Sequence, residues 1–317
     1  MSKSCKDIDK PVNFIEIGAG HAGQRIDNFL LSHLKTVPKS RVYRIVRKGE
    51  VRVNKGRIKP DYRLQLGDRV RIPPLRIEEA APKPPPASHI LTLVDASVLH
   101  EDDNLLVLNK PAGIAVHSGS GVSHGVIEAL RMLRPEAPFL ELVHRLDRDT
   151  SGCLMIAKTR PTLLALHELL RTGTMEKYYL ALVQGRWSGG ARTVNAALRR
   201  NVLRSGERMV QITEEGKEAE SVFEPQRIYA DTTLMRIALH SGRTHQIRVH
   251  AAHIGHPLAG DVKYGDADFN RAMRAIGLKR VFLHAREIAL KLPGESRKIH
   301  VTAPLPADLQ QVLEKLA

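Results

Sequence analysis

Residues 144–152 read HRLDRDTSG and combine two aspartates with two arginines in one short stretch. An aspartate is ionised near neutral pH and can act as a nucleophile or as a general base. The stretch lies between the apolar runs FLELV at 139–143 and CLMIA at 153–157, which are typical of a protein core. Spacing alone does not choose between Asp147 and Asp149, because alternate residues of an extended segment point the same way.

Three hypotheses account for these charges. The first is a salt-bridged surface turn, which would contribute only about 0–1 kcal/mol to stability. The second is phosphate chemistry, because Asp147 to Ser151 resembles the D-x-D-x-T loop of haloacid dehalogenase-like hydrolases and GDVKYGD at 260–266 resembles their magnesium-binding loop. Against it, His144 and Arg145 interrupt the apolar strand which that family needs before its first aspartate. The third is chemistry on a nucleotide, in which arginines steer the phosphodiester and fill the space of a base turned out of its helix.

The charge of the chain favours a nucleic-acid partner. The 317 residues carry a formal net charge of +15, and the segment from Arg25 to Arg76 alone holds 15 Lys and Arg against 4 Asp and Glu, a net charge of +11. Such an excess attracts polyanions. A membrane is not expected, because the sequence has no apolar signal core at its start and no run of about 18 apolar residues. With only two cysteines, Cys5 and Cys153, we expect a reduced, cytoplasmic protein.

The basic segment shows the pattern of a small folded module. RIDNFLLSHL at 25–34 and PKSRVYRIVRKG at 38–49 have apolar residues at helical spacing, and short strand signals follow at VRVN and DRVRI. On the second helix the basic residues fall on the outward side, where they would form a ridge along phosphates. This ridge consists of Arg41, Arg44, Arg47 and Lys48.

Prolines divide the chain. Pro82, Pro84, Pro85 and Pro86 indicate a semi-rigid linker. We therefore predict a leader over residues 1–22, a basic RNA-binding domain over 23–76, a linker over 77–92 and a larger domain over 93–317. In the larger domain several strand-like segments follow one another without strict alternation with helices. This order predicts an α+β fold with a mixed, largely antiparallel sheet flanked by helices, and a helix is expected to begin near Thr244.

Two resemblances extend this interpretation. Residues 24–74, with VRVNKGRIKPDYRLQLGDRVRI, resemble the S4-type RNA-binding domain. HRLDRDTSG is similar to the H-R-L-D-x-x-T-S-G signature of the pseudouridine synthases of the ribosomal large-subunit family. Further motifs of that family follow in order: VLNKPAGIAVH, EKYYLALVQG, SGRTHQIRVHAAHIGHPLAGDVKYG and LHA.

The resemblance implies roles for particular residues. The fixed aspartate of the signature matches Asp147, and Arg243 is the arginine expected to pair with it. Tyr179 matches the tyrosine that packs against the target base, and Arg145 matches the residue that fills the gap left by the flipped base. The resemblance also places three further residues among the contacts to substrate RNA, namely Lys110, His144 and Ile247.

The implied reaction is the isomerisation of uridines, at several sites, in 23S large-subunit ribosomal RNA. It exchanges no electrons or groups, so neither a small-molecule cofactor nor a metal is expected, and a monomer is the expected state. Whether Asp147 attacks the sugar, attacks the ring or removes a ribose proton stays open. Two alternatives remain beside this hypothesis: a magnesium-dependent phosphatase, and a non-catalytic RNA-binding or ribosome assembly factor that uses the basic module alone.

Overall fold

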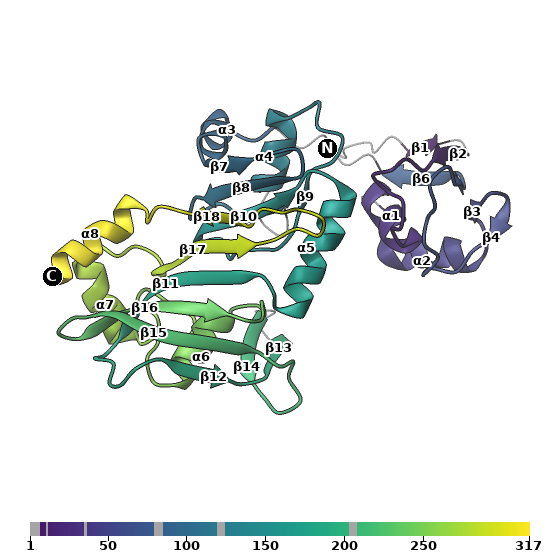
Figure 1. The fold of residues 1–317 in the computed structure, drawn as a ribbon. Helices are drawn as coiled ribbons and strands as arrows, with labels where there is room; N and C mark the ends of the chain where they lie inside the picture. Colours follow the sequence, from purple (N-terminus) through teal and green to yellow (C-terminus); the bar gives the residue numbers. More distant parts are fainter. Residues whose placement is uncertain (1–6, 11, 35–36, 79–84, 119–123, 203–207) are drawn as a thin grey trace, which may run out of the picture. The chain divides into compact units, whose positions relative to one another are not determined.

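The computed structural model describes residues 7–10, 12–34, 37–78, 85–118, 124–202 and 208–317. The chain divides into two compact units, Met1–Pro85 and Pro86–Ala317, and the division falls inside the predicted linker. Figure 1 shows the elements of each unit. None of the helices in the described ranges is long and apolar enough to cross a membrane.

The first unit packs two helices against one face of a small sheet. The helices are α1 (Ile26–His33) and α2 (Lys39–Arg47). The sheet has the order β2-β5-β3-β4, formed by β2 (Asn13–Glu16), β5 (Arg69–Ile72), β3 (Arg52–Val53) and β4 (Gly56–Arg57). Apolar residues on alternate strand positions and on the helices form one buried core, which includes Phe29, Ile45 and Val70.

The N-terminal segment belongs to this unit, which corrects the predicted leader over residues 1–22. Strand β2 pairs with β5 in antiparallel register, and β1 (Asp7–Lys10) pairs with β6 (Leu75–Glu78). Residues 1–6 and 11 of the predicted leader lie outside the described ranges. This pairing could not be predicted from local sequence patterns, because each strand is only four residues long and its partner lies more than 50 residues away in the chain.

The second unit contains a long central sheet, with the order β12-β15-β16-β11-β17-β10-β8-β7 in the described ranges (Figure 1). Its strands, in that order, are Arg192–Asn195, Glu220–Ile228, Thr232–Leu239, Glu176–Gln184, Leu283–Leu290, Ser151–Ala157, Leu105–Lys110 and Val98–Glu101. At its margins β18 (Ile299–Thr302) pairs with β17, and β9 (Glu141–Leu142) pairs with β10. A separate hairpin joins β13 (Leu198–Val202) and β14 (Arg208–Ile212).

Only the pairing of β10 with β17 is parallel among the described strand pairs of this sheet. The predicted α+β class with a mixed, largely antiparallel sheet is therefore confirmed. The parallel contact is made by the last two residues of the HRLDRDTSG stretch, Ser151 and Gly152, and depends on Gly152. That residue has a φ of 109°, and a Cβ built on it would lie 2.2 Å from the carbonyl oxygen of Ala285. Any larger residue would force the two strands apart.

Helices cover both faces of the central sheet. Helices α4 (Val126–Leu133) and α5 (Arg160–Thr172) pack on β8 and β10, and α3 (Ser88–Asp95) lies against α4. Along β11, Ala181 and Val183 contact α6 (Gln246–His253), whereas Leu182 contacts α7 (Ala267–Ala275) and α8 (Ala307–Leu316). Because alternate residues of a strand point to opposite faces, α6 lies on one face and α7 and α8 lie on the other.

Candidate active site

Asp147 lies in the loop that connects β9 to β10, and buried basic side chains hold the backbone of this loop. Lys110 Nζ donates to the carbonyl of Arg148 at 3.0 Å. Arg280 Nη1 donates to the carbonyl of Asp149 at 3.2 Å. The loop ends in a turn in which Thr150 N donates to the Asp147 carbonyl at 3.2 Å. The carboxylate of Asp147 is thus carried on a backbone that is fixed on both sides.

The structure places Lys110 beside the backbone of the Asp147 loop, and its predicted contact to RNA remains a prediction. Its side chain is fully buried, and Nζ donates also to the carbonyls of Pro111 at 2.7 Å and Ile114 at 2.9 Å. Burial lowers the pKa of Lys110 to about 7. Three carbonyls match the three protons of an ammonium, which makes Lys110 a structural support of the Asp147 loop.

His144 also supports the loop from within the fold. Its Nε2 accepts a hydrogen bond from the backbone N–H of Met155, in β10, at 3.1 Å. Burial lowers the pKa of His144 to about 4, so the ring is neutral at pH 7 and can accept this bond. The ring does not line the cavity around Asp147, and its predicted contact to RNA remains a prediction.

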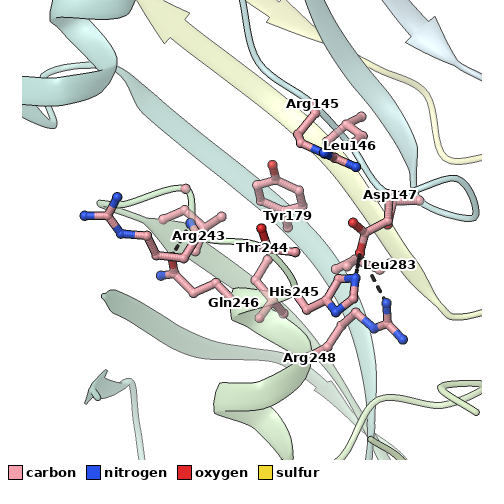
Figure 2. A pocket seen from close by; sticks show the side chains of 14 residues that line it. Arg145, Leu146, Asp147, Tyr179, Arg243, Thr244, His245, Gln246, Arg248 and Leu283 are labelled. Carbon is pink, nitrogen blue, oxygen red and sulfur yellow. Dashed lines mark hydrogen bonds and ion pairs between the residues drawn. The ribbon is translucent and has the colours of Figure 1, made fainter. Parts of the chain in front are cut away.

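A cavity opens beside Asp147, with about 530 Å³ of empty space when the open solvent at its mouth is included. Apolar and aromatic side chains from four elements form its walls: Tyr179 from β11, Leu239 from β16, Ile247 from α6 and Leu283 from β17. Arg145 lies at the cavity and is exposed. The cavity is therefore lined by five of the residues named in the sequence analysis: Asp147, Tyr179, Ile247, Arg145 and Arg243. Figure 2 shows Asp147, Tyr179, Arg145 and Arg243 around it.

Tyr179 fits a role beside an aromatic or apolar ligand. Its side chain packs against the apolar cores on both sides of it. Burial raises the pKa of Tyr179 above its ordinary value, and the nearby charge of Asp147 adds to the effect. The phenol therefore stays neutral. Its neighbour Tyr178 points to the other face of β11, where the guanidinium of Arg236 lies 3.5 Å from its ring centre.

The arginine that pairs with Asp147 is Arg248. Its Nη1 lies 3.2 Å from Asp147 Oδ2, while its Nε and Nη2 each lie 2.7 Å from an oxygen of Asp261. The Asp261 side chain is fully buried, and burial opposes its ionisation, yet the bonds from Arg248 hold its pKa below the ordinary value. Burial also opposes the charge of Arg248, but the two carboxylates raise its pKa. One guanidinium thus joins a buried carboxylate to a carboxylate at the cavity.

The prediction that Arg243 pairs with Asp147 is wrong. Arg243 lines the cavity, but its Nε donates to the carbonyl of Glu218 at 3.2 Å, and Figure 2 shows its guanidinium extending away from Asp147. The physical reason is the position of the helix start. The predicted start near Thr244 is two residues early, because His245 has a φ of 54° and α6 begins at Gln246. Arg248 is therefore in the first turn of α6 and reaches Asp147, whereas Arg243 precedes the helix.

His245 is a second neighbour of Asp147. Its Nε2 lies 3.7 Å from Asp147 Oδ2, and its Nδ1 lies 2.8 Å from the hydroxyl of Tyr264. That hydroxyl also accepts a bond from the Val210 N–H at 3.0 Å. When the hydroxyl donates to Nδ1, the ring proton lies on Nε2, which faces Asp147. Burial lowers the pKa of His245 and favours this neutral form.

Both neighbours of Asp147 contact the same oxygen, Oδ2. Among the described residues no donor contacts the other oxygen, Oδ1. The Asp147 side chain is 25% exposed, so a ligand in the cavity can reach it. The arrangement presents one oriented carboxylate oxygen next to an apolar wall.

The carboxylates that a phosphatase would need are used otherwise. Asp149 is paired with Arg148 at 3.1 Å, and both oxygens of Asp261 accept bonds from Arg248. His250, one of the histidines in the region of α6, is bonded to Ser221 and to the carbonyl of Ala196. Within the described ranges no group of three or more His, Cys, Asp or Glu is placed to hold a metal ion.

The predicted basic ridge on α2 is present in the first unit. Arg44, Arg47 and Lys48 are exposed, and Arg41 is half-buried. On the same helix Val42, Ile45 and Val46 are buried in the core, as the apolar stripe predicted.

The resemblance to the pseudouridine synthases assigned no individual role to His245, Arg248, Asp261 or Tyr264. All four lie inside the stretch SGRTHQIRVHAAHIGHPLAGDVKYG, which was quoted as a motif. A signal was available for one pair. Arg248 stands between the buried residues Ile247 and Val249, and an arginine buried in a helix needs a carboxylate partner. Asp261 is the partner that the structure supplies.

Comparisons with known proteins agree with this site. The RNA pseudouridylate synthase family model matches residues 104–253, and the S4 domain model matches residues 24–70. The ribosomal large subunit pseudouridine synthase C of Haemophilus influenzae is 54% identical over 98% of this chain and 97% of its own length. The protein of that name from Escherichia coli K12 is 53% identical over 96% and 97%.

Solved structures show the same fold. Human RNA pseudouridylate synthase domain containing 4 superimposes with a TM-score of 0.60 at 24% identity, covering 72% of this chain and 97% of its own. Human RNA pseudouridylate synthase domain containing 1 gives a TM-score of 0.55 at 24% identity, covering 66% and 83%. From its sequence relatives and its fold, the chain belongs to the RNA pseudouridine synthases, in the group of the ribosomal large subunit pseudouridine synthases.

Proposed function

We propose that this protein isomerises uridines to pseudouridines in 23S large-subunit ribosomal RNA, and that Asp147 is the essential carboxylate. The observation that carries the proposal is the asymmetric environment of Asp147. Arg248 and His245 fix Oδ2, while Oδ1 is left to a ligand in the cavity. The target RNA is supported by the names of relatives that are 53–54% identical over nearly the whole chain.

The cavity suits an isomerisation in which the uracil leaves its sugar, turns and is rejoined through carbon. Tyr179, Ile247 and Leu283 offer an apolar wall on which a detached ring can turn without losing hydrogen bonds to the protein. Asp147 Oδ1 would attack the sugar, attack the ring or remove a ribose proton, and each route needs the carboxylate ionised. The Arg248 guanidinium lies 3.2 Å from Asp147 Oδ2 and places a positive charge beside the carboxylate.

Arg145 and the basic module would supply the RNA contacts. Arg145 is exposed beside the cavity, where its guanidinium can enter the space that a flipped uridine leaves in the RNA. The ridge of Arg41, Arg44, Arg47 and Lys48 would bind phosphates at a second place. We propose further that the protein acts as a cytoplasmic monomer, without a metal or a small-molecule cofactor.

The test is nucleotide-resolution mapping of pseudouridine in large-subunit ribosomal RNA incubated with the protein. We expect Asp147→Asn to reduce the rate of modification by roughly 10³-fold or more, because the amide can act neither as a nucleophile nor as a base. Asp149→Asn is the matched control. Asp149 is two residues away and paired with Arg148, so this variant should stay within about tenfold of the wild type.

The two arms separate the hypotheses. Retained modification by Asp147→Asn would refute the catalytic assignment. If even the wild-type protein forms no pseudouridine but binds the RNA, a non-catalytic assembly factor is the better explanation.

A further inference from the structure

The sheet of the first unit carries a continuous row of side chains across one face. The registers pair Phe14 of β2 with Arg71 of β5, Arg71 with Arg52 of β3, and Arg52 with Arg57 of β4. Directly paired residues of neighbouring antiparallel strands lie on the same face of a sheet. On the opposite face Val53, Val70 and Ile72 are buried against the helices. The row, together with Arg69 on the same face, is called here the Phe–Arg face.

The Phe–Arg face is exposed and unneutralised. Phe14 is 50% exposed, and the guanidinium of Arg69 lies over its ring at 4.5 Å from the centre. Among the described residues, none of its four arginines forms an ion pair with a carboxylate. Like charges in directly opposed positions repel one another. A fold that keeps three arginines in one cross-strand row is expected to meet a polyanion there.

Backbone contacts hold two of these arginines in place. Arg71 Nη1 donates to the carbonyl of Glu50 at 2.9 Å, and Arg52 Nε donates to the carbonyl of Gly49 at 3.3 Å. Both acceptors belong to the turn that follows α2. The guanidinium groups are thus ordered before any ligand arrives, which reduces the entropy cost of binding.

A broad groove runs along the part of this face that carries Phe14, Arg52, Arg69 and Arg71, and its lining also includes Lys48 and Lys55. Lys55 is at the tip of the hairpin between β3 and β4 and has a φ of 68°, a conformation that glycine adopts with less strain. Its ammonium extends the basic surface to the tip. Glu50 is the acidic residue among those that line the groove, and Glu16 stands opposite Arg69 in the register.

We infer that the Phe–Arg face binds an unpaired segment of RNA, with a base stacked on the Phe14–Arg69 pair and phosphates on Arg52, Arg57 and Arg71. Unpaired RNA presents base faces that aromatic rings and guanidinium planes can stack on, whereas a duplex presents mainly phosphates and sugars. Basic side chains alone would suit either form. The exposed Phe14 ring is what favours the single strand.

This site is distinct from the ridge on α2, apart from Lys48, and Phe14 lies outside residues 24–70, which match the S4 domain model. The inference rests on the proposed function only in taking RNA as the ligand.

The experiment compares full-length variants for binding to an RNA strand of about ten nucleotides and to the same strand annealed to its complement. We expect Phe14→Ala to weaken binding of the single strand by roughly 5- to 100-fold and to leave duplex binding unchanged, because only a base can use the ring. Arg52→Ala should lower the salt-dependence slope for the single strand by about 0.7, because Arg52 is placed on a phosphate. Leu66→Ala is the control, since Leu66 is 70% exposed in the same unit but lies outside the groove.

A second measurement does not depend on loss of binding. In a Trp187→Phe background, which removes the natural tryptophan, Phe14→Trp places a fluorophore on the face. Stacking of a base should quench its emission when the single strand is added. Absence of quenching together with wild-type affinity of Phe14→Ala would overturn the inference. An equal loss for strand and duplex would also overturn it, because the face would then bind phosphates without stacking.

Pseudouridine formation on a short stem-loop substrate separates this inference from the proposed function. If Phe14→Ala is active and binds the single strand with unaltered affinity, the inference about the Phe–Arg face is refuted and the enzyme assignment stands. If the wild-type protein is inactive but Phe14→Ala binds the single strand more weakly than the wild type does, the enzyme assignment is refuted and the inference about the Phe–Arg face is supported.

Discussion

A single guanidinium, that of Arg248, serves a buried carboxylate and a carboxylate at the cavity. Its two 2.7 Å bonds to Asp261 fix the plane of the group, and its remaining nitrogen then meets Asp147 Oδ2 at 3.2 Å. The orientation of Asp147 is therefore set by Asp261, which lies 114 residues further along the chain. Lysine could not replace this arginine, because an ammonium lacks the planar fork that satisfies both partners.

Arg248→Met should affect stability as well as activity. Asp261 would be left as a buried charge without its main partner, and we expect the free energy of unfolding to fall by about 3–5 kcal/mol in urea titrations. Modification of RNA should fall too. Arg243→Ala is the matched control, because its Nε bond to a carbonyl is exposed, and its unfolding free energy should change by less than about 0.5 kcal/mol.

A double variant separates the two effects. Arg248→Met combined with Asp261→Asn should recover much of the stability without recovering activity, since the buried charge is then removed while Asp147 stays without its partner. Wild-type unfolding of Arg248→Met alone would show that the Asp261 pair is unimportant.

At the residue scale, the residues that line the cavity were easier to predict from the sequence than the hydrogen-bond and ion-pair partners of each side chain. Asp147, Tyr179, Ile247 and Arg145 were all named before the structure, and all line one cavity. The partner of Asp147 was assigned to Arg243 instead of Arg248, because the choice depends on where α6 begins and one residue in the left-handed region moves that start. The sequence predicts RNA contacts for Lys110 and His144, whereas in the structure both side chains form hydrogen bonds with backbone groups. Burial of individual polar side chains cannot be read from motif spacing.

At the scale of elements, the loop from β9 to β10 is held by groups that must remain in one protonation state. His144 accepts a hydrogen bond from the Met155 N–H. His284 in β17 accepts a hydrogen bond from the Ser151 hydroxyl at 2.9 Å and donates one to the Ala303 carbonyl at 3.2 Å. Burial lowers the pKa of each ring to about 4. Both rings therefore act as neutral connectors between the Asp147 loop and the central sheet.

This arrangement predicts a loss of stability in mild acid. An unfolded histidine has a pKa near 6.5, so between pH 6.5 and pH 4 the unfolded chain binds more protons than the folded chain. The stability is fully present above pH 6.5 and is lost as the pH falls. From pH 7 to pH 5 each ring should cost about 2 kcal/mol, measured by urea unfolding at the two values.

His144→Gln tests the assignment, because its amide oxygen can still accept the Met155 N–H but does not titrate. The variant should show a shallower pH dependence than the wild type. His253→Gln, at an exposed position of α6, should keep the wild-type dependence. The same slope in all three proteins would exclude His144 as a source of the acid sensitivity.

Most long elements were predictable, and the short ones were not. The apolar patterns placed α1 and α2 within a few residues of their observed bounds, and the apolar run at 153–157 lies within β10. The strands β1 and β2 were missed, since a four-residue segment such as NFIE has too few positions to show alternation. Their formation depends on edges offered by β6 and β5, and that is tertiary information.

At the scale of the whole molecule, the chain combines a catalytic unit of the family with a basic unit that carries most of the net charge. The basic segment between Arg25 and Arg76 lies wholly inside the first unit, Met1–Pro85. The second unit has apolar cores of its own on both faces of its sheet. Each unit thus contains what it needs to fold.

Deletion of residues 1–85 should leave a folded catalytic unit that binds RNA weakly. We expect the affinity for large-subunit RNA to fall and the dependence of affinity on salt to become shallower, because fewer phosphates are neutralised. Binding measured across a salt series tests this, with urea unfolding as the check that the remaining unit is intact. Unchanged affinity and slope would mean that the first unit does not bind the RNA.

The shared guanidinium has a further effect on what can enter the cavity. Asp147, Asp261 and Arg248 together carry one negative charge, and a neutral His245 adds nothing to it. A phosphate placed against the Asp147 carboxylate is therefore expected to be repelled, whereas the uncharged sugar and uracil are tolerated there. Arg145 and Arg243 stand nearby as cations suited to the flanking phosphodiesters. A nucleotide inside an RNA chain fits this distribution of charge better than free uridine monophosphate, because the terminal phosphate of the free nucleotide is a dianion. We therefore expect this arrangement of charges to favour a uridine within RNA over free uridine monophosphate.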